Sequence, residues 1–204
     1  MRKIWLVIIA NCLLLSQGYA AQTTTIAAFG DSLFTGYGLS DEDSFPSQLE
    51  QKLRADGYAI TMINDGVSGD TTAGGVSRVD QVIAQKPDII MLDLGGNDLL
   101  RAVPPAETRK NLETIMEHIK QAHIRTILIG QKAPLTLGAA YASAYNSLFP
   151  DIAASYGAVL YPFFLEGVYN HPELMQADGV HPTKDGIVIM VNSLYPLITA
   201  GLKK

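Results

Sequence analysis

The sequence is poor in cysteine, tryptophan and charge. Its 204 residues include one cysteine, Cys12, and one tryptophan, Trp5. A single thiol cannot form an intramolecular disulfide or supply a metal site built from two or four cysteines. Charged residues make up 17% of the chain, and 20 acidic residues against 15 basic ones give a net charge of −5. Because no segment clusters lysine and arginine, binding to nucleic acid is not expected.

The sequence also lacks a hydrophobic run of comfortable membrane-spanning length. The apolar run Ile4–Leu15 is shorter than the roughly 20 apolar residues that a transmembrane helix needs. Two basic residues precede this run, and the small residues Gly18 and Ala20 follow it. This pattern predicts a secretory signal over residues 1–20, cleaved after Ala20. The alternative is an uncleaved membrane anchor.

Cleavage would change the composition of the chain. It would remove two of the 15 basic residues and none of the 20 acidic ones, which leaves 13 against 20 and a net charge of −7. Cys12 and Trp5 would be lost as well. The predicted mature protein, residues 21–204, is a single domain located in the periplasm or outside the cell. We expect it to be a monomer without a stable membrane anchor.

Short apolar runs alternate with longer amphipathic ones along this mature chain. The clearest helix carries Leu112, Ile115, Met116 and Ile119 on one stripe. Strands that alternate with helices form right-handed crossovers and a parallel sheet covered on both faces. The predicted fold is therefore α/β, a three-layer α/β/α arrangement around a mostly parallel, five-stranded sheet. The predicted strands are 25–29, 58–64, 89–94, 126–129 and 158–161, and the predicted helices are 46–55, 104–121, 139–156 and 182–200.

Small polar turns follow the first three predicted strands. They are Gly30-Asp31-Ser32-Leu33, Asn64-Asp65-Gly66-Val67-Ser68-Gly69-Asp70 and Gly95-Gly96-Asn97-Asp98. Each alone could be a simple connection, because Gly, Asn, Asp and Ser are common turn residues. In an open parallel sheet, however, ligands bind beyond the carboxyl ends of the strands. The three turns together indicate a functional site at that edge.

A nucleophile at this edge would need a base, and the chain has four histidines. His118 and His123 are expected to face solvent, and His171 precedes a proline in a predicted loop. His181 lies in Asp178-Gly179-Val180-His181-Pro182. There, Asp178 can fold back onto Nδ1 of the imidazole and leave Nε2 free as a base. His181 could otherwise be only a residue at the entry to a helix.

Other common motifs are incomplete. Asp70 replaces the second glycine of a G-x-S-x-G motif, so Ser68 is a poor nucleophile candidate. Gly36-Tyr37-Gly38 lacks the third glycine of a dinucleotide-binding loop, and the chain has no G-K-[ST] phosphate-binding sequence. The histidines lack paired metal-ligand spacing. No metal or cofactor is therefore expected.

The sequence resembles the SGNH (GDSL) hydrolases in four blocks that occur in family order. These blocks are Gly30-Asp31-Ser32-Leu33, Gly69, Gly95-Gly96-Asn97-Asp98 and Asp178-Gly179-Val180-His181. Within that family, the motifs are most similar to those of the bacterial acyl-CoA thioesterase/protease/lysophospholipase group and its arylesterase relatives. The resemblance covers nearly the whole mature chain and implies the flavodoxin-like fold of these enzymes.

The resemblance also implies a role for each site residue. Ser32 would be the nucleophile, His181 the general base and Asp178 the carboxylate that orients it. The oxyanion would be held by the backbone N–H groups of Ser32 and Gly69 and by the side-chain amide of Asn97. These roles agree with the chemistry, because a hydroxyl needs an adjacent base and the oxyanion needs preplaced donors.

The predicted substrate-binding region is less well defined. The segment Lys132–Gly138 corresponds to a loop that shapes acyl-chain preference in the most similar relatives, but its sequence differs from theirs. The preference of these relatives for a particular acyl-chain length therefore cannot be carried over to this protein. An apolar groove is predicted from Leu135, Leu137, Tyr141 and Phe164, although such residues are more often core.

The leading hypothesis is a serine hydrolase of small-molecule acyl esters and thioesters that forms a covalent acyl-Ser32 intermediate. The first alternative is a carbohydrate O-acetylesterase of the same superfamily with a different pocket. The absence of tryptophan from the mature chain argues against a tryptophan-rich sugar platform. The second alternative, a non-catalytic periplasmic binding protein on a hydrolase scaffold, is disfavoured by the intact set of motif residues.

Overall fold

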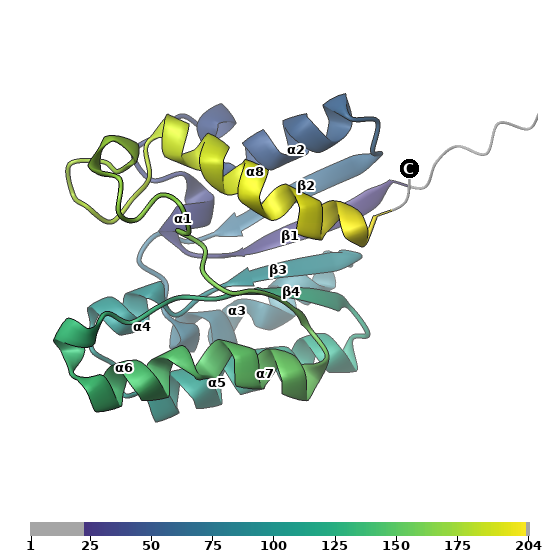
Figure 1. Cartoon of the computed structure of the whole chain (residues 1–204). Coiled ribbons are helices and arrows are strands. Elements are labelled where there is room, and N and C mark those ends of the chain that lie inside the picture. The colour runs from purple at the N-terminus through teal and green to yellow at the C-terminus, as the bar shows by residue number, and fades with distance from the viewer. Residues whose placement is uncertain (1–22, 203–204) are drawn as a thin grey trace, which may run out of the picture.

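The computed structural model describes residues 23–202, which form an open parallel β-sheet between two layers of helices (Figure 1). The spatial order of the strands is β2-β1-β3-β4-β5, and every neighbouring pair is parallel. This confirms the predicted α/β class and the five-stranded sheet. The strands are β1 Thr24–Gly30, β2 Ile60–Gly66, β3 Ile89–Asp93, β4 Arg125–Ile129 and β5 Val159–Tyr161.

Both faces of the sheet are covered, because successive side chains of a strand point to opposite sides. On β1, Ile26 and Ala28 pack into one apolar core with residues of α2 and α8. Ala27 and Phe29 pack into the other core, with residues of α3, α5, α6 and α7. Figure 1 shows these two helical layers above and below the strands. The helices are α1 Ser32–Thr35, α2 Phe45–Ala55, α3 Thr72–Ala84, α4 Gly96–Leu100, α5 Pro105–Gln121, α6 Ala139–Asn146, α7 Leu148–Tyr156 and α8 Lys184–Ala200.

Polar side chains start four of these helices at defined residues. Ser44, Thr71 and Thr183 each accept a hydrogen bond from a backbone N–H in the first turn of α2, α3 and α8. Asp31 does the same for α1 through the N–H of Leu33. These caps satisfy backbone donors that have no partner within the helix.

The single helix predicted over 139–156 is wrong, since the structure breaks it into α6 and α7 at Ser147. Pro150 explains the break. It has no N–H to donate to the carbonyl of Asn146, four residues earlier, and a proline is tolerated only in the first turn of a helix. Pro150 accordingly occupies the first turn of α7.

Helix α3 was not predicted, because its sequence contains two adjacent glycines, which are poor helix formers. The packing explains both. A Cβ at Gly75 would collide with Leu94, directly after β3, and one at Gly74 would collide with the carboxylate of Asp70. The glycines therefore let α3 lie close to the site edge of the sheet, at a cost in helix propensity.

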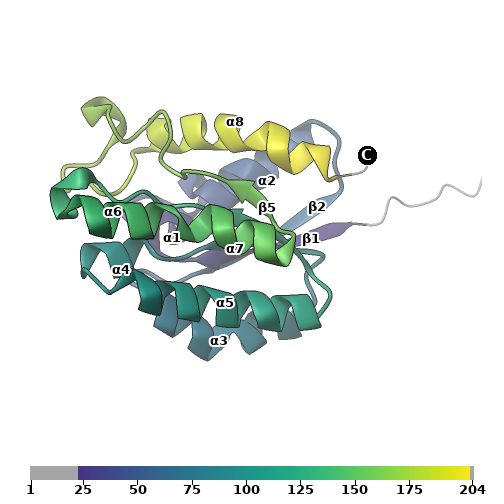
Figure 2. The same ribbon diagram turned by 60° about the horizontal axis from the view of Figure 1, so that its bottom comes forward.

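The predicted signal, residues 1–20, lies outside the described residues, so the structure does not test it. Within residues 23–202, none of the helices is both long and apolar enough to cross a membrane. Turning the molecule by 60° brings α3, α5 and α7 forward and shows β5 at the edge of the sheet beside α7 (Figure 2).

Candidate active site

The carboxyl ends of the strands bring together the motif residues predicted from the sequence. Ser32 follows β1, Gly69 follows β2 and Asn97 follows β3, whereas Asp178 and His181 lie in the segment between β5 and α8. Apart from Asp178, all of these residues line one cavity. Asp178 contacts the cavity through His181. The fold thus places residues far apart in the sequence at a common edge.

Ser32, His181 and Asp178 form a continuous chain of contacts. Oγ of Ser32 lies 2.7 Å from Nε2 of His181. On the other side of the ring, Nδ1 of His181 lies 2.6 Å from Oδ2 of Asp178. An ionised carboxylate can only accept, so it favours the tautomer with the proton on Nδ1 and leaves Nε2 to accept the Ser32 hydroxyl proton. This arrangement can activate a hydroxyl.

Asp178 is held in place by its own turn. Its Oδ1 accepts backbone N–H groups from Val180 at 2.9 Å and from His181 at 3.0 Å. The hydrogen bond from the His181 side chain, followed by these two backbone bonds, lowers the pKa of Asp178 to about 2. The carboxylate is therefore ionised throughout the neutral range, although it is exposed to solvent.

Two residues that the sequence analysis did not select support the His181 loop. The ring of Tyr37 lies against the imidazole, with 4.5 Å between ring centroids. The Gln176 amide donates to the backbone carbonyls of Tyr37 at 2.8 Å and Pro182 at 2.9 Å. A Cβ at Gly38 would collide with Gln176, which explains that glycine. The side of the molecule that carries Ser32 is thus joined to the loop that carries His181.

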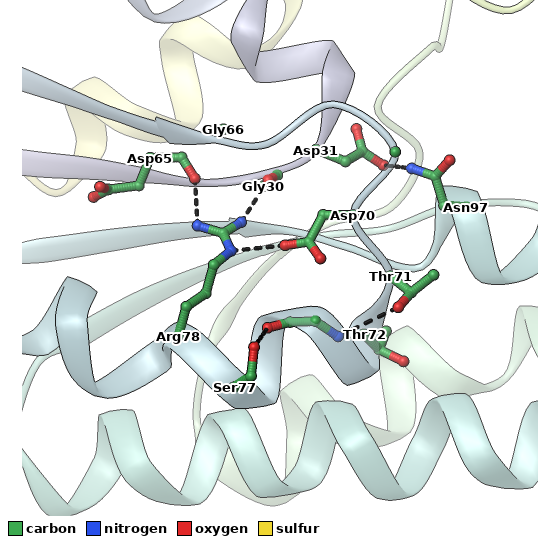
Figure 3. Close-up of polar contacts among 12 residues, drawn as sticks. Gly30, Asp31, Asp65, Gly66, Asp70, Thr71, Thr72, Ser77, Arg78 and Asn97 are labelled. Carbon is green, nitrogen blue, oxygen red and sulfur yellow. Dashed lines mark hydrogen bonds and ion pairs between the residues drawn. The ribbon is translucent and has the colours of Figure 1, made fainter.

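Two buried carboxylates lie behind Ser32. Asp31 accepts from the Asn97 amide at 3.1 Å (Figure 3), and burial raises the pKa of Asp31 to about 6. Asp93, at the end of β3, accepts from the Gln131 side chain at 2.7 Å. Burial, reinforced by the negative charge of Asp31, raises the pKa of Asp93 well above its usual value. Asp93 could not be predicted as a site residue, because its burial depends on the neighbouring strands of the sheet.

The turn that carries Gly69 is fixed by an arginine from α3. Arg78 donates to the carbonyls of Gly30 at 2.8 Å and Asp65 at 2.6 Å, and to the Asp70 carboxylate at 2.7 Å (Figure 3). Gly69 itself has a φ of +78°, which disfavours any side chain. Space within the protein is not the reason, because a Cβ there would approach only Arg101, at 3.8 Å. The backbone conformation requires the glycine.

The cavity over Ser32 and His181 has a volume of about 470 Å³. Most of its wall consists of aliphatic and aromatic side chains from α4 and from the segments after β4 and β5. Such a pocket suits an apolar ligand oriented by a few polar groups. The apolar side chains in its wall include Leu99, Leu100, Leu137, Phe163, Leu165 and Tyr169.

Of the four predicted groove residues, Leu137 alone is among those that line this cavity. Phe164 is fully buried and packs against Phe34 and Phe45 in the core. The Tyr141 hydroxyl donates to the Val103 carbonyl, and Leu135 is 78% exposed. The neighbour of Phe164, Phe163, faces the cavity instead.

The remaining histidines lie away from the site. His118 contacts Asp80 at 2.8 Å, and His171 contacts Glu173 at 3.2 Å, both on exposed surface. Oγ of Ser68 lies 2.9 Å from the Thr35 hydroxyl. Within residues 23–202, no histidine forms a hydrogen bond with it. In this part of the chain, no group of three or more histidine, cysteine or acidic side chains is arranged to hold a metal ion.

Comparison with known proteins agrees with this geometry. The model of the GDSL-like lipase/acylhydrolase family matches residues 28–187. The chain is 33% identical to esterase TesA of Pseudomonas aeruginosa, over 94% of this chain and 96% of that protein. It is also 33% identical to thioesterase 1/protease 1/lysophospholipase L1 of Escherichia coli K12, over 88% and 87% of the two chains.

Solved structures show the same relationship. AlinE4, an SGNH-hydrolase family esterase, has 44% sequence identity to this chain and a TM-score of 0.75. The match covers 90% of this chain and 98% of AlinE4. The four sequence blocks, the strand order and the family match lead to one conclusion: this chain belongs to the GDSL-like lipase/acylhydrolase family.

Proposed function

We propose that the protein hydrolyses acyl esters and thioesters through a covalent acyl-enzyme on Ser32. The observation that carries this proposal is the 2.7 Å contact between Oγ of Ser32 and Nε2 of His181, with Asp178 on the opposite ring nitrogen. The names of the related esterase and thioesterase support the same reaction class.

In the first half-reaction, Nε2 of His181 removes the proton from Ser32 as Oγ attacks the acyl carbon. The carbonyl oxygen becomes an oxyanion, held by the N–H groups of Ser32 and Gly69 and by the Asn97 amide. Collapse of this intermediate breaks the bond to the leaving alcohol or thiol, which takes the proton from His181. Asp178 stabilises the imidazolium that forms between these two steps.

In the second half-reaction, water replaces the leaving group. His181 takes one proton from the water as its oxygen attacks the acyl carbon of the ester on Ser32. The second oxyanion occupies the same donors, and its collapse returns the proton to Oγ of Ser32 and releases the carboxylic acid. No cofactor enters either half-reaction.

The apolar wall of the cavity favours acyl chains over acetylated sugars. Leu99, Leu137 and Phe163 bury hydrocarbon favourably but offer no hydrogen bonds to sugar hydroxyls. We further propose that residues 1–20 direct export and that the mature protein acts as a monomer in the periplasm or outside the cell.

The test uses the purified protein with a short-chain nitrophenyl ester and an organophosphonate. Wild type should hydrolyse the ester and take up one phosphonate per chain at Ser32, whereas Ser32→Ala should lose both properties. Ser68→Ala is the matched control, because it removes a neighbouring hydroxyl and should still be labelled at Ser32. Turnover by Ser32→Ala at the wild-type rate would reject the mechanism.

A further inference from the structure

The two carboxylate oxygens of Asp31 accept hydrogen bonds from different donors. Oδ1 accepts the backbone N–H of Leu33 at 3.0 Å and caps α1, directly beside Ser32. Oδ2 accepts from Nδ2 of Asn97 at 3.1 Å, across 66 residues of sequence (Figure 3). Asp31 is 2% exposed, so these contacts take the place of water.

Capping of α1 alone does not explain why residue 31 is an aspartate. Serine caps a helix about as well, and burying a carboxylate is costly unless its oxygens are hydrogen-bonded. What aspartate adds here is the second oxygen, and that oxygen is directed at Asn97. Gly96 leaves room for it, because a Cβ at that residue would lie 3.2 Å from Oδ2 of Asp31.

The contact determines which way the Asn97 amide faces. An amide presents a carbonyl oxygen or an NH₂ group according to a rotation about its last bond, and the two ends are almost the same shape. An ionised carboxylate accepts hydrogen bonds and repels a carbonyl oxygen, so it selects the NH₂ end. The amide has two N–H bonds, and the one that does not go to Asp31 remains available to the cavity that Asn97 lines.

We propose that Asp31 is a positioning residue that orients the Asn97 amide, so that its second N–H is preplaced for the oxyanion. This inference rests on the proposed function of the site. Asp31 touches no reacting atom and acts through Asn97. The oxyanion donor would then be oriented before the substrate arrives, which is the condition under which such donors accelerate a reaction most.

Two substitutions separate this role from the cap. Asp31→Ser keeps an oxygen that can cap α1 but is too short to reach Asn97. Asp31→Asn keeps the shape but has one oxygen for two donors, so either Leu33 or Asn97 loses its acceptor. Both variants should lower kcat by about tenfold or more, within the roughly 10²–10³ that one oxyanion donor is worth. KM for a short-chain ester should change by less than about threefold, because the amide acts in the transition state.

The deciding experiment is a double-mutant cycle with Asn97→Ala, using kcat of the purified full-length protein and its thermal melting curve. Once the amide is gone, Asp31→Ser should lower kcat by no more than about twofold, because it has nothing left to orient. Tyr145→Phe is the matched control. It removes another buried hydrogen bond, which goes to the Gly95 carbonyl rather than to Asn97, and its effect should be additive with Asn97→Ala.

Each outcome bears on one claim. Full additivity of Asp31→Ser with Asn97→Ala, in proteins that melt well above the assay temperature, would overturn the positioning role and leave the hydrolase mechanism intact. Wild-type kcat in Asn97→Ala would overturn it too. Activity in Ser32→Ala would instead overturn the proposed function. If Asp31→Ser does not fold, the same cycle is measured with Asp31→Asn.

Discussion

Asp178 contributes a negative charge to the site over the whole range in which an imidazole titrates. Hydrogen bonds from His181 and Val180 lower its pKa to about 2, so it is ionised above that pH and protonated only below it. The neutral imidazole is the form that can take a proton from Ser32. Acid should therefore inactivate the enzyme by protonating the His181 imidazole and the Asp31 carboxylate, whose pKa is about 6, whereas Asp178 remains charged.

We predict that kcat/KM for a nitrophenyl ester falls in acid, because a protonated imidazole cannot take the proton from Ser32 and because Asp31, whose pKa is about 6, loses its charge. Asp178→Asn should lower kcat by about 10³–10⁴ at neutral pH, because it loses the charge that orients and stabilises the imidazolium. A pH–rate profile from pH 4 to 9 measures both effects. A flat acid limb in wild type would argue against His181 as the base.

Among single residues, the sequence is sufficient to predict a contact where the two partners are close together in the chain. Asp178 and His181 are three residues apart, so their turn could be predicted without a structure. Gln176 and Tyr37 are 139 residues apart, and their contact depends on how α8 packs against α2. Phe163 and Phe164 are adjacent and equally apolar, so the sequence alone cannot say which of the two faces the cavity.

Helix α3 and strands β1 and β2 are connected through one side chain. Arg78 reaches the carbonyls at the ends of both strands and the Asp70 carboxylate beside Gly69. Its side chain is 16% exposed and that of Asp70 is 10% exposed. Removing one partner of so deeply buried an ion pair strongly destabilises the folded protein, because the other charge is left without a partner.

We predict that Arg78→Met lowers the free energy of unfolding by about 3–5 kcal/mol. Adding Asp70→Asn should restore part of that loss, since it removes the uncompensated charge. Urea denaturation measures both variants. The matched control is Arg109→Met, which breaks a more exposed pair with Asp151 and should cost about 1 kcal/mol or less. Equal losses in Arg78→Met and Arg109→Met would contradict the role assigned to Arg78.

The elements that could be predicted are those with a clear hydrophobic period. Helix α5 has its apolar stripe at the spacing that buries it, and Leu112, Ile115 and Ile119 are fully buried. Helix α3 has Gly74 and Gly75 where a helix former is expected. The reason for these glycines is their close packing against Asp70 and Leu94, which only the structure shows. Local propensity thus fails where tertiary packing decides.

For the whole molecule, alternation of strand and helix was enough to predict a parallel α/β sheet with the site at its carboxyl edge. The processing of the chain is a separate matter, which depends on residues 1–20. Their basic start, short apolar run and small residues before position 21 predict removal of this segment during export.

We predict that the full sequence, expressed in a bacterial host, yields a mature protein beginning at Ala21 in the exported fraction. Intact mass and N-terminal sequencing identify this product. Replacing Ala20 by Phe should block cleavage, because the position requires a small side chain. A wild-type protein that still begins at Met1 and stays in the membrane fraction would favour the uncleaved anchor instead.

The separation of 149 positions between Ser32 and His181 in the sequence has a consequence during biosynthesis. The hydroxyl leaves the ribosome early, but its imidazole partner is made only shortly before the final helix. A nascent or prematurely terminated polypeptide that lacks His181 therefore cannot hydrolyse acyl esters or thioesters by the proposed mechanism.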